Sequence, residues 1–136
     1  MRTLLAIVLA LALAPSIALA GGGSKPNSTV RVKNSGSNTL AVIVDPSSSV
    51  SNSLSSGTLS TQSFVRAGGQ FVGPGGTATI GGLKAGSHSV TAAFVSGTAN
   101  GSSVGTADSA SVNLTKGKTT TITATGSTAA GVTLSP

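Results

Sequence analysis

The feature that most constrains this chain is an alternation of apolar and polar residues with a period of two. The segment 87–95 places Val90, Ala92 and Phe94 at every second position, and 29–34 alternates two valines with two basic residues. Such a period puts successive side chains on opposite faces of a β-strand. Since the chain shows no helical period beyond its first twenty residues, the sequence predicts an all-β fold.

The expected strands are short and are separated by turn-forming residues. In 40–44 both alternating faces are apolar, so this strand is expected to be buried on both sides, and Asp45-Pro46 ends it. Residues 47–57 and 96–107 are rich in Ser, Gly, Ala and Thr and are expected to be surface loops. Further strands are expected at 58–66, 77–80 and 87–95, and 110–114 is expected to pair with 120–124 as a hairpin turning at Lys116-Gly117. For residues 127–136 the sequence fits either a last edge strand or a tail.

About seven short strands with this spacing favour a two-sheet antiparallel sandwich of the Ig-like or transthyretin-like kind. The chain has no Cys, Trp or Tyr, so the Cys…Trp…Cys pattern of antibody domains is missing. Large side chains are few, and Phe64 and Phe94 are the expected anchors of a thin core.

The first twenty residues have the pattern of a secretory signal peptide. Arg2 supplies a short positive region, 4–14 is an unbroken apolar run, and Ala18-Leu19-Ala20 fits the small-x-small cleavage rule. The run is shorter than the roughly 20 apolar residues that span a bilayer. We therefore expect a Sec-type signal cleaved after Ala20, a flexible leader at 21–28, and a single domain at 29–136 with no membrane span. This predicts a protein that is secreted, periplasmic or held at the cell surface.

A glycine cluster in VGPGGTATIGGL looks at first like a phosphate-binding loop. Gly73, Gly75 and Ala78 fit the loose spacing of a dinucleotide fingerprint. In that fingerprint a helix must follow the glycines, and here a β-branched stretch of period two follows instead. The GKT at 117–119 fails in a similar way, because Val112 stands where a Walker loop needs glycine. We expect turns at both places and no nucleotide.

Side chains for acid–base chemistry are scarce. Asp45, Asp108 and His88 are the whole inventory, since the chain has no Glu. No serine lies in a G-x-S-x-G motif, and one histidine with two separated aspartates makes a poor set of metal ligands. We expect no enzymatic activity, no cofactor and no metal, and we expect His88 to be solvated or to cap the turn beside it.

The charge is strongly lopsided, with eight basic residues against two acidic ones and a formal net charge of +6. Arg31 and Lys33 are expected on one exposed strand face, and Lys116 and Lys118 at one turn. These four residues are candidate contacts for a polyanion such as acidic polysaccharide, lipopolysaccharide or nucleic acid. Aromatic residues that stack on single-stranded nucleic acid are missing from these stretches. The alternative, that these side chains only keep the protein soluble, stays open.

The segments GGTATIGGLKAGSHSVTAAF and SASVNLTKGKTTTITATG resemble a recurring module of bacterial exported proteins, the carboxypeptidase-regulatory-like (transthyretin-like) and PEGA-like sandwiches. The matching positions are Gly82, Leu83, Gly86 and Val90 in the first segment and Val112, Gly117 and Ile122 in the second. Pro46 stands where a PEGA-type turn has glycine. The resemblance implies a non-catalytic spacer, an adhesive unit or a domain that faces carbohydrate.

The sequence thus predicts a secreted, non-enzymatic β-sandwich with a structural or protein-interaction role at or outside the cell surface. The alternative is a module that binds a glycan or a polyanion. Cell-surface polysaccharide and another surface protein both stay open as partners. Glycan-binding faces usually offer an exposed aromatic ring, and Phe71 is the candidate for it.

Overall fold

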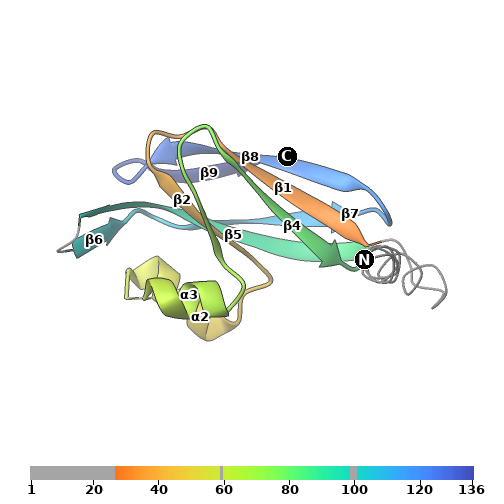
Figure 1. The fold of residues 1–136 in the computed structure, drawn as a ribbon, viewed down its shortest axis with the longest axis horizontal. Helices are drawn as coiled ribbons and strands as arrows, with labels where there is room; N and C mark the ends of the chain where they lie inside the picture. Colours follow the sequence, from red (N-terminus) through yellow and green to blue (C-terminus); the bar gives the residue numbers. More distant parts are fainter. Residues whose placement is uncertain (1–26, 59, 99–100) are drawn as a thin grey trace, which may run out of the picture.

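The computed structural model of the chain describes residues 27–58, 60–98 and 101–136. The expected signal peptide at 1–20 and most of the leader lie outside these ranges. The described part forms nine strands and two short helices. They stack as three layers, with one sheet above, a second sheet in the middle and the two helices below (Figure 1). The predicted two-sheet sandwich is therefore confirmed in outline, with a helical layer added to it.

The first sheet, which we call sheet A, has the strand order β4 (Thr77–Leu83), β1 (Ser28–Asn34), β8 (Thr119–Ser127) and β9 (Gly131–Ser135). The pairs β1–β4 and β8–β9 are antiparallel, whereas β1 and β8 run parallel, with Thr29 opposite Thr119. The expectation of an antiparallel arrangement throughout is therefore wrong at the centre of this sheet.

The second sheet, sheet B, has β2 (Thr39–Val44) between β3 (Gln70–Val72) and β5 (Gly86–Thr98), and all of its pairs are antiparallel. The other side of β5 is shared by two strands: β7 (Asp108–Leu114) pairs with its first half and β6 (Gly101–Val104) with its end. β6 occupies part of the stretch 96–107 that was expected to be a loop.

The hairpin expected from 110–114 and 120–124 is wrong, because β7 belongs to sheet B and β8 to sheet A. A turn does lie where it was predicted, with the Lys118 N–H donating to the Thr115 carbonyl at 3.0 Å, but it carries the chain from one sheet to the other. Val112 and Ile122 face the same core from opposite sheets. A hairpin and a pair of facing sheets therefore show the same alternation of apolar residues.

The main core fills the space between the two sheets, and Phe94 is fully buried in it. From β2, Leu40 and Val42 point into this core, while Ala41 and Ile43 point to the opposite side, toward the helices. The prediction that this strand is buried on both faces is confirmed.

A helix, α2 (Ser48–Ser56), occupies the stretch that was expected to be a loop. Ser47 begins it, because its side chain accepts the N–H of Val50 at 3.4 Å, and Gly57 ends it in the left-handed conformation with φ +71°. Leu54 follows Val50 by one helical turn, so both point to the same side. Leu54 is buried against sheet B.

A second helix, α3 (Thr61–Arg66), replaces the strand that was expected at 58–66. The Ser60 side chain accepts the N–H of Ser63 at 3.2 Å and begins this helix in the same way. Phe64 is buried against Ala41 and Ala93, whose small side chains let the helices lie close to the sheet. Phe64 and Phe94 are thus both core residues, as predicted, on opposite faces of sheet B.

The glycine-rich turn and the C-terminal segment are both defined. Residues 73–76 form the turn from β3 to β4, in which the Gly76 N–H donates to the Gly73 carbonyl at 3.0 Å, and a strand follows instead of a helix. The segment left open at 127–136 forms β9, an edge strand that buries Val132 and Leu134 against the core.

Candidate functional site

The outward face of sheet A presents two basic residues between threonines. By register, Arg31 on β1 lies between Thr79 on β4 and Thr121 on β8. One step further along the strands, Lys33 lies between Thr77 and Thr123. We call these six residues the basic threonine face.

The sequence dictates which way these side chains point. Val30 and Val32 of β1 and Ile122 of β8 are fully buried in the core, so the residues that alternate with them face solvent. Arg31 and Lys33 are exposed as a result. β-Branched threonine suits such a strand while offering a hydroxyl to the outside.

None of these six side chains makes a hydrogen bond or an ion pair with another described residue. The only ion pair in the described ranges joins His88 to Asp45, on the other sheet. The two cations and four hydroxyls of the face are therefore available to a ligand without breaking any contact within the described part of the protein.

The parallel pairing of β1 with β8 places the turn that carries Lys116 and Lys118 beside the start of β1, the strand that carries Arg31 and Lys33. The carbonyl of Lys118 accepts the N–H of Thr29 at 3.0 Å, so the turn with Lys116 and Lys118 adjoins the start of β1. Along the common direction of the two strands this turn comes first, then Arg31, then Lys33.

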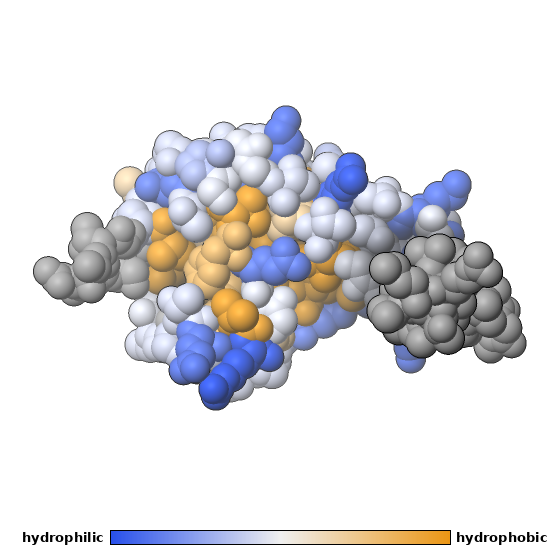
Figure 2. Space-filling view, in the orientation of Figure 1, coloured by the Kyte–Doolittle hydropathy of each residue, from blue (hydrophilic) through white to orange (hydrophobic). Residues whose placement is uncertain are grey.

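No acidic residue belongs to a strand of sheet A, because Asp45 follows β2 and Asp108 opens β7. Blue, hydrophilic side chains project from the upper edge of the molecule, on the side of sheet A (Figure 2). The positive charge of this face is therefore not neutralised by neighbouring strand residues.

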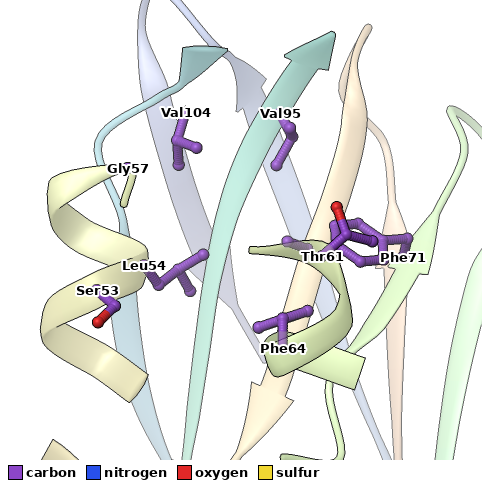
Figure 3. A pocket seen from close by; sticks show the side chains of 9 residues that line it. Ser53, Leu54, Gly57, Thr61, Phe64, Phe71, Val95 and Val104 are labelled. Atoms are coloured by element: carbon purple, nitrogen blue, oxygen red, sulfur yellow. The ribbon is translucent and has the colours of Figure 1, made fainter. Parts of the chain in front are cut away.

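A pocket lies on the opposite side of the molecule, between the helices and sheet B (Figure 3). Its volume is about 30 Å³, whereas small-molecule sites have roughly 300–1,000 Å³. Leu54 and Phe64 point into it from the helices, and Val95 and Val104 from the strands. This pocket is a packing gap in the apolar cluster between the helices and sheet B.

Phe71, the predicted aromatic contact for a glycan, borders this pocket and is 39 % exposed. Its ring packs on Phe64, with centroids 5.1 Å apart and an angle of 57° between the rings. The structure therefore places Phe71 with the helices and does not bring it together with Arg31 and Lys33.

His88 is held by hydrogen bonds on both ring nitrogens, so of the two expected arrangements the solvated ring is wrong and the ring that caps the turn beside it is found. Nδ1 bonds to Oδ2 of Asp45, and Nε2 lies 2.7 Å from the carbonyl oxygen of Lys84. Both partners are acceptors, so the protonated ring, which donates from both nitrogens, fits this site. The Asp45 carboxylate, and after it the Lys84 carbonyl, raise the pKa of His88 above its ordinary value of 6.5.

Asp45, the partner of His88, is also held by hydrogen bonds. Burial acts to raise the pKa of this carboxyl, but hydrogen bonds from the Ser89 N–H, at 2.8 Å, and from His88 outweigh it and lower the pKa below 3.8. The Asp45 N–H in turn donates to the Ser89 carbonyl at 2.8 Å. The Asp45–His88 pair therefore links the end of β2 to β5 and to the turn between β4 and β5. Since Nε2 of His88 faces the Lys84 carbonyl, the ring has no lone pair directed at a substrate in this arrangement.

No three His, Cys, Asp or Glu side chains gather as metal ligands anywhere in the described ranges. Neither helix of the described part is long and apolar enough to cross a membrane.

Fold and site together define a two-sheet β-sandwich that carries two helices on one sheet and an exposed basic face on the other. No family model matches this sequence, and no curated protein sequence matches it. In structure the chain is similar to the N-terminal domain of AlgF from P. aeruginosa. The identity is 20 % and the TM-score 0.39, over 84 % of this chain and 99 % of that domain.

Proposed function

We propose that this protein is a non-enzymatic, exported β-sandwich module, of the broad Ig-like or transthyretin-like kind, that acts by contact at or outside the cell surface. Its role is structural or lies in binding another molecule. The signal-like first twenty residues support export. Mass spectrometry of protein recovered outside the cytoplasm tests this, because the mature chain should begin at Gly21.

The site geometry supports contact over catalysis. Asp45 and His88 bond to each other and to the backbone, and both ring nitrogens of His88 are occupied within the fold. Arg31 and Lys33, in contrast, have no side-chain partner among the described residues and lie on an open sheet face. A broad hydrolase screen of the purified protein should be blank, and activity abolished by His88→Gln would overturn this part of the proposal.

The basic threonine face favours one kind of contact, the binding of a polyanion. The observation that carries this function is the alignment of Arg31 and Lys33 with the Lys116–Lys118 turn along one strand pair, in a sheet with no acidic strand residue. Such a line of like charge attracts an extended chain of negative charges. Binding should weaken as salt rises, because ions screen exposed charges.

Two matched double variants test the polyanion function. Arg31→Gln with Lys33→Gln removes two charges from the face, and Arg66→Gln with Lys84→Gln removes two charges from elsewhere. We expect the first variant to elute from a heparin column at clearly lower salt than the second. Equal losses in both variants would mean that net charge alone holds the polyanion, and a wild type that is not retained at low salt would refute the function.

A further inference from the structure

We propose that the ligand of the basic threonine face is a linear acidic polysaccharide with about one carboxylate per sugar, lying along β1. This inference rests on the polyanion function proposed above and names the chemical class of its ligand. Three observations lead to it: the ratio of charges to hydroxyls on the face, the spacing of its cations and the position of the aromatic residues on other parts of the protein.

The face offers more hydroxyls than charges. Each of its two rows has one cation between two threonines, and Thr119 and Thr125 extend the hydroxyls along β8. A hydroxyl both donates and accepts, which is what a sugar hydroxyl needs in a partner. A uronate-type sugar, with one carboxylate and several hydroxyls, has the matching ratio. A heavily sulfated glycan carries more charges and fewer free hydroxyls per sugar than one row of the face would match, and a nucleic acid offers few hydroxyls.

The cations are spaced for an extended ligand. Arg31 and Lys33 are two residues apart on one strand, which separates them by about 6.7 Å, and each has a threonine about 4.8 Å away on either side. A carboxylate bound by the Arg31 guanidinium therefore has sugar hydroxyls beside it within reach of Thr79 and Thr121. The turn with Lys116 and Lys118 continues the line beyond the start of β1. We expect longer oligosaccharides to bind more tightly than a disaccharide.

The aromatic residues lie elsewhere, so charge has to supply the recognition. Phe94 is buried between the sheets, and Phe64 and Phe71 lie on the helical side of sheet B. Neutral glycans are usually held by stacking on an exposed ring, and this face has none. The neutral form of the same polymer should therefore not bind.

The test uses polygalacturonate oligomers and their fully methyl-esterified counterparts, which share a backbone and differ in the carboxylate charge. Isothermal titration calorimetry of the exported chain at low salt should show binding of the acid and none of the ester. Equal binding of the two would overturn the proposal. So would binding of single-stranded DNA or heparin that is tighter than that of polygalacturonate.

A second arm separates hydroxyl recognition from simple charge attraction. Thr79→Val with Thr121→Val removes two hydroxyls and keeps the side-chain shape and the strand preference. We expect polygalacturonate to bind about five-fold more weakly for each hydroxyl lost, while heparin retention stays unchanged. If both ligands bind the double valine variant as they bind the wild type, this inference fails and the polyanion function stands. If neither ligand binds the wild type at low salt, the polyanion function itself fails.

Discussion

The side chain of Asn34 donates to the carbonyl of Val72 at 2.9 Å and so joins the end of β1 in one sheet to the end of β3 in the other. The same amide nitrogen donates to the Asn38 carbonyl at 2.8 Å, and the amide oxygen accepts the Gly36 N–H at 2.9 Å. Asn34 is fully buried with both side-chain polar atoms bonded. This asparagine fixes how the two sheets meet at one end.

Replacing Asn34 with alanine should lower the free energy of unfolding by about 1–3 kcal/mol, because buried carbonyl groups would lose their donors. Urea denaturation monitored by circular dichroism measures this. Ser37→Ala, at an exposed position of the same turn, is the control and should stay within about 0.5 kcal/mol of the wild type. An Asn34→Ala protein as stable as this control would contradict the role given to the asparagine.

The Asp45–His88 pair should make stability depend on pH in a defined window. Because the pKa of His88 is raised in the folded protein, its contribution is complete below 6.5 and is lost as the pH rises through the folded value. The pKa of Asp45 is lowered, so its contribution is present above 3.8 and is lost as the pH falls through the folded value. The stability difference between wild type and His88→Gln should thus be largest between these limits.

Urea denaturation of both proteins from about pH 5 to about pH 9 checks this window. The difference in unfolding free energy should shrink toward the alkaline end. A difference that stays constant over the range would show that the His88 ring acts by packing alone.

Phe94→Ala should cost roughly 3–5 kcal/mol, since it removes the largest side chain of the core between the sheets. Phe71→Ala, at a ring that is 39 % exposed, is the matched control and should cost clearly less. Thermal melts of the two variants measure the difference. Equal shifts in melting temperature would contradict the role of Phe94 as the anchor of this core.

Gly36→Ala should destabilise the fold by about 1–3 kcal/mol, because a Cβ at this position would overlap the Phe94 ring and the Gly126 carbonyl oxygen. Gly73→Ala is the control, since a Cβ there meets no atom within 4 Å. Combining Gly36→Ala with Phe94→Leu should cost less than the sum of the two single changes, because the smaller side chain makes room. Strict additivity would mean that the two positions are not in contact.

The strands could be predicted from the sequence wherever apolar residues follow a period of two. The two-sided burial of residues 40–44 and the alternation around Phe94 follow from apolar spacing alone. The helices were missed because their serines and threonines favour a helix only weakly. A signal for α2 was nevertheless present: a capping Ser47, apolar Val50 and Leu54 one helical turn apart, and Gly57 at the end.

Strand neighbours were harder to predict than strands. Alternation tells which side chains share a face but not which strand lies beside it. Val112 and Ile122 fit a hairpin and a pair of facing sheets equally well, and the structure has the second. For the same reason the four basic residues could be predicted only as two separate pairs. The bond between His88 and Asp45, at positions far apart in the chain, left no local signal.

The parallel neighbours β1 and β8 also determine when this fold can assemble. β1 emerges early during synthesis, and its parallel partner β8 follows only after both helices and every strand of sheet B have been made. A contact between such distant segments carries a large loop-closure cost and slows folding. Until β8 arrives, β1 can pair only with β4, and Val30 and Val32 lack the cover of Ile122. We therefore expect nascent chains that stop short of β8 to be sensitive to proteases and in need of a chaperone.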